Sequence, residues 1–155
     1  MFFKKKVIAI IPAKHYSSGL AKKNYLKLNN LSLFEIAAKS ALKSKYIDMV
    51  FISSDSKAIL KKSKELGILS IKRNKNLCLK NTSANKVVEH AVNHVRKIFL
   101  KDFIVIYLQP TSPFRNHKHI DEAFNKFKKK KIQSPISLTK NLNTIYKSVK
   151  LKKGV

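Results

Sequence analysis

Apolar residues in this chain gather in short runs separated by polar segments, and the runs predict buried strands. Residues 7–11 (VIAII), 49–52 (MVFI), 68–71 (ILSI) and 103–108 (FIVIYL) form four such runs, and residues 134–138 (SPISL) predict a fifth strand. Continuous apolar runs, rather than alternating ones, are typical of parallel strands that helices cover on both faces.

Amphipathic helical patterns lie between these strands. Each helix is expected to begin at a polar residue that can accept a hydrogen bond from a first-turn N–H, and Ser32 with Glu35 has the spacing of a capping box. Gly67 is expected to end the second helix in a left-handed conformation. The expected helix starts are Ser32, Asp55, Thr82 or Ser83, and Asn116 or His117.

Strands that alternate with helices predict a three-layer, Rossmann-like α/β domain with a mostly parallel sheet. We place this domain at residues 1–140 and treat residues 141–155 as a tail or the start of a further segment. Open sheets of this kind bind ligands at the carboxyl ends of their strands. The loops at that edge are expected to be residues 14–24, 53–55 and 109–115, together with Arg73.

The loop at residues 109–115 (QPTSPFR) carries the strongest pattern. Pro110 and Pro113 restrict the backbone and remove two N–H donors, so the side chains of Gln109 and Arg115 are presented in a fixed geometry. A rigid polar loop directly after a buried strand predicts one rim of a ligand site.

The loop after the first strand contains Lys14, Ser17 and Lys23, whose side chains can neutralise or donate to phosphate oxygens. The loop lacks the GxxxxGK[ST] pattern of a Walker loop, and a solvated lysine-rich loop remains the alternative. Arg73 could bind a ligand or lie on the surface. Asp55 is interpreted as a helix cap rather than a metal ligand.

The composition is strongly basic, with 34 Lys and Arg against 8 Asp and Glu, and a formal net charge of +26. Such an excess is typical of proteins that meet nucleic acids, anionic membranes or small anions. Only three of the basic residues are arginines, whereas specific nucleic-acid readers favour the bidentate guanidinium. We interpret the excess first as compositional bias, and we expect any binding of nucleic acid to be non-specific and salt-dependent.

A single cysteine, Cys78, provides no disulfide framework and indicates a reducing cytoplasm. No apolar run approaches the roughly 18 residues that span a bilayer, so no membrane partner is expected. His90 and His94 lie four residues apart, a spacing that can bind metal, but an ordinary helical pair is the alternative. We predict no metal centre in this chain.

Taken in order, the polar segments resemble a known family. Residues 7–13, with Gly19, Lys23 and Asn24, are similar to the opening of the acylneuraminate cytidylyltransferases, and residues 108–115 (LQPTSPFR) match a later family segment. The resemblance covers roughly residues 6–138, and relatives that activate legionaminic acid are at least as similar as the sialic acid enzymes. It implies a nucleotide-diphospho-sugar transferase type of fold that couples CTP to a nine-carbon nonulosonic acid with release of pyrophosphate, assisted by Mg²⁺.

The same resemblance implies roles on the nucleotide side of the site. Lys14, Ser17 and Lys23 would hold the triphosphate, with Lys14 and Lys23 as the catalytic residues. Asn24 would act near the nucleotide.

Further implied roles fall on the other strand ends. Arg73 and Ser83 would line the cytidine side, and Gln109 would contact the sugar acid. Arg115 would either brace its loop or contact ligand.

The chain also departs from the family pattern. Lys14 replaces a usual arginine, bulky His15 and Tyr16 replace small residues, and the late Asp pair that binds Mg²⁺ in the family is not present. We therefore expect a truncated or divergent N-terminal portion of a CMP-nonulosonate synthetase, poorly active or inactive by itself. A homodimer is implied if the full family arrangement applies.

Two other functions remain open. One is a non-catalytic domain that binds nucleotides or polyanions. The other is a nucleotidyltransferase for another sugar acid, such as 3-deoxy-manno-octulosonate, and the QPTSP loop argues against it.

Overall fold

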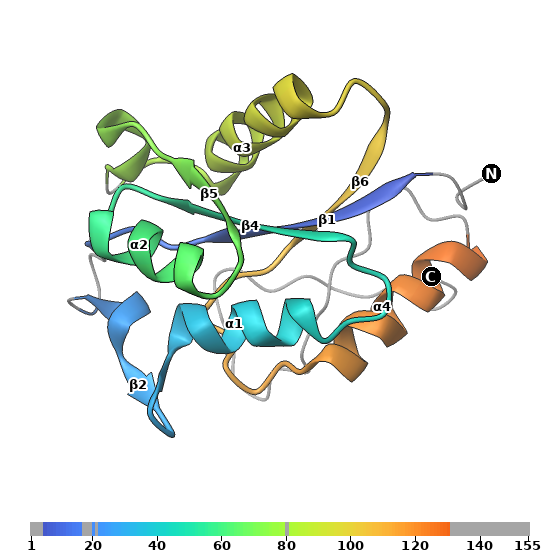
Figure 1. Ribbon diagram of the computed structural model, residues 1–155, viewed down its shortest axis with the longest axis horizontal. Helices are drawn as coiled ribbons and strands as arrows, with labels where there is room; N and C mark the ends of the chain where they lie inside the picture. Colours follow the sequence, from blue (N-terminus) through green and yellow to red (C-terminus); the bar gives the residue numbers. More distant parts are fainter. Residues whose placement is uncertain (1–4, 17–19, 21, 80, 131–155) are drawn as a thin grey trace, which may run out of the picture.

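A four-stranded parallel sheet forms the centre of the molecule in the computed structural model, which describes residues 5–16, 20, 22–79 and 81–130 (Figure 1). Its strands are β1 (Lys6–Pro12), β4 (Met49–Ser54), β5 (Leu69–Lys72) and β6 (Phe103–Tyr107), in the order β5-β4-β1-β6. All three strand pairings are parallel. The four predicted strands are therefore confirmed to within two residues at each end, and their carboxyl ends share one edge.

Helices cover both faces of this sheet. One face carries α1 (Leu33–Leu42), α2 (Lys57–Glu65) and α4 (His117–Lys130), whereas α3 (Ala84–Ile98) covers the other (Figure 1). This arrangement confirms the three-layer α/β prediction. The remaining described elements are short: η1 (Lys23–Tyr25), β2 (Lys27–Leu28), β3 (Leu31–Ser32) and η2 (Lys75–Cys78).

The alternation of side chains along β1 supplies both halves of the core. Ile8 and Ile10 face α3, whereas Ala9 and Ile11 face α1 and α2, and all four are fully buried. A central strand buried on both faces needs an uninterrupted apolar sequence, which explains why this run was readable from the sequence.

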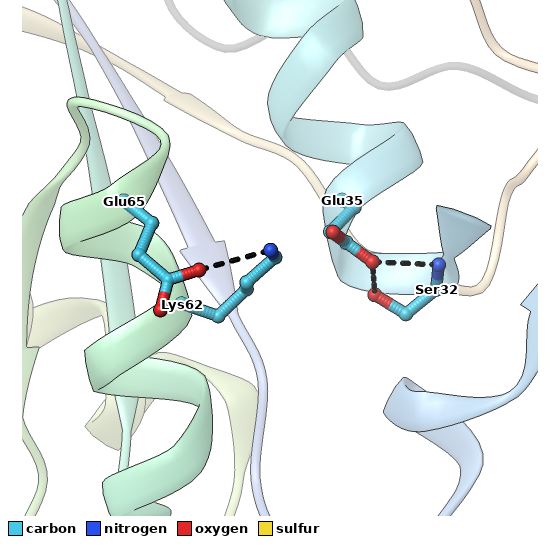
Figure 2. A network of polar contacts seen from close by, with 4 residues as sticks. All are labelled: Ser32, Glu35, Lys62 and Glu65. Carbon is cyan, nitrogen blue, oxygen red and sulfur yellow. Dashed lines mark hydrogen bonds and ion pairs between the residues drawn. The ribbon is translucent and has the colours of Figure 1, made fainter. Parts of the chain in front are cut away.

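Helix α1 begins at the predicted capping box. The Glu35 carboxylate accepts hydrogen bonds from the backbone N–H of Ser32 at 2.9 Å and from its hydroxyl at 2.5 Å (Figure 2). On the neighbouring helix, Lys62 forms an exposed ion pair with Glu65 at 2.9 Å (Figure 2). The capping box fixes where the chain turns from the β2–β3 ribbon into α1.

Two other helix boundaries test the sequence analysis. Gly67 has φ of 68° just after α2, which confirms the left-handed stop. The predicted cap at Asp55 is wrong, because Ser56 caps α2 and its hydroxyl accepts from the N–H of Ile59 at 3.3 Å. The Asp55 carboxylate instead accepts a hydrogen bond from the backbone N–H of His15 at 2.8 Å, across 40 residues of chain.

The β2–β3 ribbon was not predicted. Asn29 and Asn30 form its turn with φ of 49° and 64°. Two consecutive positive φ angles fit a two-residue hairpin turn, for which asparagine is favoured. The predicted fifth strand at residues 134–138 and the tail at residues 141–155 lie outside the described residues.

Candidate functional site

A cavity of about 200 Å³ opens at the carboxyl edge of the sheet. The β1 end, the segments that follow β5, the start of α3 and the β6 end all contribute to it. Its lining residues are Pro12, Lys14, Lys23, Asn24, Arg73, Leu77, Leu79, Thr82, Ala84, Val87, Tyr107, Gln109, Pro110 and Thr111. The cavity therefore lies where parallel sheets of this class bind their ligands.

Two lysines of the first loop line the cavity as the sequence analysis placed them. Lys14 follows β1 and Lys23 begins η1, and both are half-buried. Buried Asn24 holds the two segments together, because its amide donates to the Lys14 carbonyl at 2.8 Å. Asn24 thus shapes the loop as well as lining the cavity, whereas Ser17 lies outside the described residues.

Arg73 is one of the most buried polar residues in the described part of the chain, with 4% of its surface exposed. Its guanidinium donates to the Ser53 carbonyl at 2.7 Å and to the Ser53 hydroxyl at 3.2 Å. The surface alternative for Arg73 is therefore wrong. The backbone of Arg73 is also fixed, since its N–H donates to the Ser54 carbonyl at 2.8 Å.

The loop at residues 109–115 divides into a residue that lines the cavity and a residue that supports it. Gln109 is exposed and lines the cavity, whereas Arg115 does not. The Arg115 guanidinium donates to the Gln109 carbonyl at 2.9 Å, and the Ser40 hydroxyl of α1 donates to the Arg115 carbonyl at 3.0 Å. Burial lowers the pKa of Arg115, and its Nε–H has no hydrogen-bond partner among the described residues. Arg115 was expected either to brace its loop or to contact ligand, and these contacts match a residue that braces its loop.

Ser83 lies beside the cavity rather than in its lining. Its hydroxyl accepts from the N–H of Lys86 at 3.4 Å, so Ser83 caps α3, one of the two starts expected for that helix. Its neighbours Thr82 and Ala84 line the cavity. The start of α3 is therefore brought to the site, with the Ser83 hydroxyl engaged at the helix end.

The lining is cationic. It contains Lys14, Lys23 and Arg73, and none of the described lining residues is an aspartate or a glutamate. Burial raises the pKa of Tyr107, although the charge of Arg73 opposes this rise, so the Tyr107 phenol stays protonated at neutral pH. Such a lining attracts an anion with several charges.

Clusters of potential metal ligands are not found in the described part of the chain. Within residues 5–16, 20, 22–79 and 81–130 no group of three or more His, Cys, Asp or Glu side chains could hold a metal ion. His90 and His94 belong to no such group within these ranges. Burial, together with nearby Arg73, His94 and Lys97, lowers the pKa of His90 and keeps its ring neutral.

Several lining residues were missed by the sequence analysis. Leu77, Leu79 and Val87 supply an apolar wall, and Tyr107 supplies a ring at the end of β6. The position of Tyr107 at a strand end was the one available signal. The apolar wall gave none, because leucines in a loop are common in sequences and only the folded chain brings Leu77 and Leu79 to the same cavity as Val87.

Fold and cavity together define an open, parallel α/β domain with a cationic pocket at the carboxyl edge of its sheet. Residues 8–153 match the family described as Cytidylyltransferase, and the chain belongs to this family.

Two relatives illustrate the similarity. The chain is 32% identical over 137 residues to an N-acylneuraminate cytidylyltransferase of Escherichia coli O18:K1:H7, a match that covers 88% of this chain and 32% of the relative. It is 28% identical over 123 residues to a pseudaminic acid cytidylyltransferase of Campylobacter jejuni, a match that covers 79% of this chain and 53% of the relative. The chain thus spans between a third and about half of these relatives.

Solved structures share the fold. A CMP:2-keto-3-deoxy-manno-octonic acid synthetase complexed with CTP superimposes with a TM-score of 0.62 at 19% identity, over 81% of this chain and 48% of that one. A 4-diphosphocytidyl-2C-methyl-D-erythritol synthase superimposes with a TM-score of 0.63 at 12% identity, over 79% of this chain and 54% of that one. At these identities the likeness concerns the fold.

None of the helices in the described ranges is long and apolar enough to cross a membrane.

Proposed function

We propose that this chain is the CTP-binding part of a cytidylyltransferase that activates a nonulosonic acid of the sialic type. The observation that carries the proposal is the convergence of Lys14, Lys23 and Arg73 on one cavity without a carboxylate. The nucleotide substrate of a cytidylyltransferase is CTP, a nucleoside triphosphate and therefore an anion with several charges. The relatives named for N-acylneuraminate and pseudaminic acid support a nine-carbon sugar acid as the acceptor.

The reaction transfers a cytidylyl group. The anomeric hydroxyl oxygen of the sugar acid forms a bond to the α-phosphorus of CTP, the bond from that phosphorus to the bridging oxygen breaks, pyrophosphate leaves, and the hydroxyl proton is released. Because charge develops on the phosphoryl oxygens, catalysis depends on positioning and on nearby cations. We assign Lys14 and Lys23, together with Ser17, to the triphosphate, with the two lysines as the catalytic residues.

We assign the remaining residues to the two ends of the substrates. Arg73 and Ser83 are assigned to the cytidine side, and Asn24 to the loop next to the nucleotide. Gln109 is assigned to the sugar acid, on the exposed rim of the cavity. Magnesium is implied by the family, although within the described residues no group of three or more His, Cys, Asp or Glu side chains could hold it.

A second candidate function is a domain that binds nucleotides or polyanions without catalysis. The net charge of +26 favours it, because so large an excess attracts any polyanion. It predicts equal affinity for CTP and ATP, and no turnover.

Isothermal titration with CTP, ATP and cytidine separates the two functions. We expect CTP to bind more tightly than ATP and much more tightly than cytidine, and Lys14→Ala with Lys23→Ala to abolish the preference for CTP over cytidine. Lys61→Ala, an exposed lysine of α2, is the matched control and should leave both affinities unchanged. Indifference to the base would favour the second function.

The role of Gln109 has its own test. In a protein that releases pyrophosphate from CTP and a nonulosonic acid, Gln109→Ala should raise KM for the sugar acid and leave KM for CTP unchanged. An unchanged dependence on the sugar acid would remove this role from Gln109.

A further inference from the structure

A polar network joins the first loop to the turn between β4 and α2. The backbone N–H of His15 donates to the Asp55 carboxylate at 2.8 Å. The His15 ring contacts Tyr25, with Nδ1 3.1 Å from the Tyr25 hydroxyl and the two rings edge to face at 5.7 Å between centroids. The Tyr25 hydroxyl in turn forms a hydrogen bond with the Ser56 hydroxyl, which caps α2. We call these four residues, His15, Tyr25, Asp55 and Ser56, the loop clamp.

The backbone on both sides of the loop clamp is also held by partners distant in the sequence. The Ala13 N–H donates to the Ser53 carbonyl at 2.9 Å, and the Ser54 hydroxyl donates to the Ala13 carbonyl at 2.5 Å. The Lys14 carbonyl accepts from Asn24 at 2.8 Å. Each residue from 13 to 15 is therefore fixed to another element, which determines where the Lys14 side chain leaves the backbone.

Tyr25 connects the loop clamp to the second lysine. It lies in the same short helix as Lys23 and Asn24, and these three residues perform different tasks. Lys23 lines the cavity, Asn24 fixes the Lys14 carbonyl, and Tyr25 anchors η1 to the start of α2. A single hydroxyl thus ties both lysine-bearing segments to the start of α2.

We propose that the loop clamp positions Lys14 and Lys23 for the phosphate groups of the nucleotide, so that Tyr25 and Asp55 are positioning residues that determine how tightly polyphosphate is held. The inference rests on the proposed function, since it assigns phosphate to these lysines. Its physical basis is preorganisation: a flexible lysine loses side-chain and loop freedom when it binds, and a backbone fixed in advance reduces that cost. Because the lysines act on phosphate alone, the effect applies to CTP and not to cytidine.

The test compares the affinities of CTP and cytidine for Tyr25→Phe and for a matched control. Tyr25→Phe keeps the ring and removes the hydroxyl. We expect it to weaken the affinity for CTP about three- to tenfold, because the bonds of this hydroxyl to His15 and Ser56 are lost, and to leave the affinity for cytidine unchanged. Tyr46→Phe removes a half-buried hydroxyl bond elsewhere, to Asn125 of α4, and should change neither affinity.

A pair of substitutions at Asp55 provides a second, independent measurement. Asp55→Asn keeps a side-chain oxygen that can accept from the His15 N–H, whereas Asp55→Ala has no acceptor. We expect Asp55→Asn to retain most of the affinity for CTP. Asp55→Ala should weaken the affinity for CTP as much as Tyr25→Phe does, and neither substitution should change the affinity for cytidine. Circular dichroism of each variant confirms that the fold is kept, and the Asn variant carries the comparison if the Ala variant does not fold.

The outcomes separate the two proposals. If wild-type protein prefers CTP to cytidine and Tyr25→Phe retains that preference in full, the loop clamp is overturned while the proposed function stands. If Tyr25→Phe weakens the affinity for CTP and the affinity for cytidine equally, the hydroxyl has only a structural role and the inference fails. If the wild type binds CTP no more tightly than cytidine, the proposed function is overturned and the loop clamp with it.

Discussion

Arg73 illustrates at the scale of a single residue what the structure adds. From the sequence it was one arginine among many lysines. In the fold it is buried, and no aspartate or glutamate of the described residues forms an ion pair with it. Its bonds go to Ser53, whose carbonyl also accepts the Ala13 N–H. A buried cation held only by neutral groups is costly, and a hydrogen-bond acceptor on a bound nucleotide would compensate it.

Arg73→Met is expected to separate stability from binding. Because the Ser53 carbonyl keeps its bond from Ala13, the change should alter the free energy of unfolding by less than about 1 kcal/mol. The affinity for CTP should fall by about tenfold or more, the effect of losing a charged hydrogen bond. Urea unfolding and calorimetry measure the two quantities, with exposed Arg96→Met as the control. A large loss of stability with unchanged CTP affinity would make Arg73 a purely structural residue.

Helix starts show at the scale of an element how local patterns can succeed or fail. The capping box of α1 was predicted because Ser32 and Glu35 satisfy each other within four residues. The start of α2 was misplaced, because residues 53–56 (SSDS) offer several cap residues in a row. The local sequence cannot choose among them, since the choice depends on the His15 N–H, which only the folded chain brings to Asp55.

Glu35→Ala is expected to destabilise the protein in a pH-dependent way. Burial acts to raise the pKa of Glu35, but the hydrogen bonds from Ser32 and the charges of Lys62 and Lys39 outweigh it, and the pKa lies below the usual value of 4.5. The ionised carboxylate therefore stabilises the fold fully above that value, and this contribution is lost as the pH falls through the lower pKa of the folded state. At pH 7 the substitution should cost about 1 kcal/mol, typical of a lost helix cap.

Urea unfolding at pH 7 and at pH 3 measures this difference. The gap between wild type and Glu35→Ala should shrink at the lower pH. Glu89→Ala, at an exposed position in α3, should show little change at either pH. A gap that stays constant with pH would exclude the charged cap as its source.

Charge is the dominant property at the scale of the whole molecule. The excess of 26 positive charges is spread along the chain, and three of the cationic side chains converge on the cavity. Positive charge is thus concentrated at the carboxyl edge of the sheet and spread out over the rest of the surface. A long polyanion should contact the diffuse charge, whereas a nucleotide should depend on the cavity.

Single-stranded RNA is therefore expected to bind weakly, without sequence preference and with a steep salt dependence. Its affinity should fall by orders of magnitude between 50 and 200 mM salt if about six or more phosphates are neutralised. Fluorescence anisotropy with labelled oligonucleotides of different sequence measures this. Lys14→Ala should weaken the affinity for CTP much more than the affinity for RNA. A marked preference for one RNA sequence would contradict the interpretation of the lysine excess as non-specific.

The sequence by itself determined the four described strands, most helix boundaries and the family, because each depends on short patterns: apolar runs, capping residues and segments such as residues 109–115. It also placed Lys14, Lys23 and Gln109 at the correct edge of the sheet, since parallel strands bring their carboxyl ends together. Only the tertiary structure decided that Arg73 is buried, that Arg115 supports its loop and that Asp55 holds His15. Those roles depend on hydrogen bonds between residues far apart in the chain, and such contacts are set by how the layers pack and not by any local pattern.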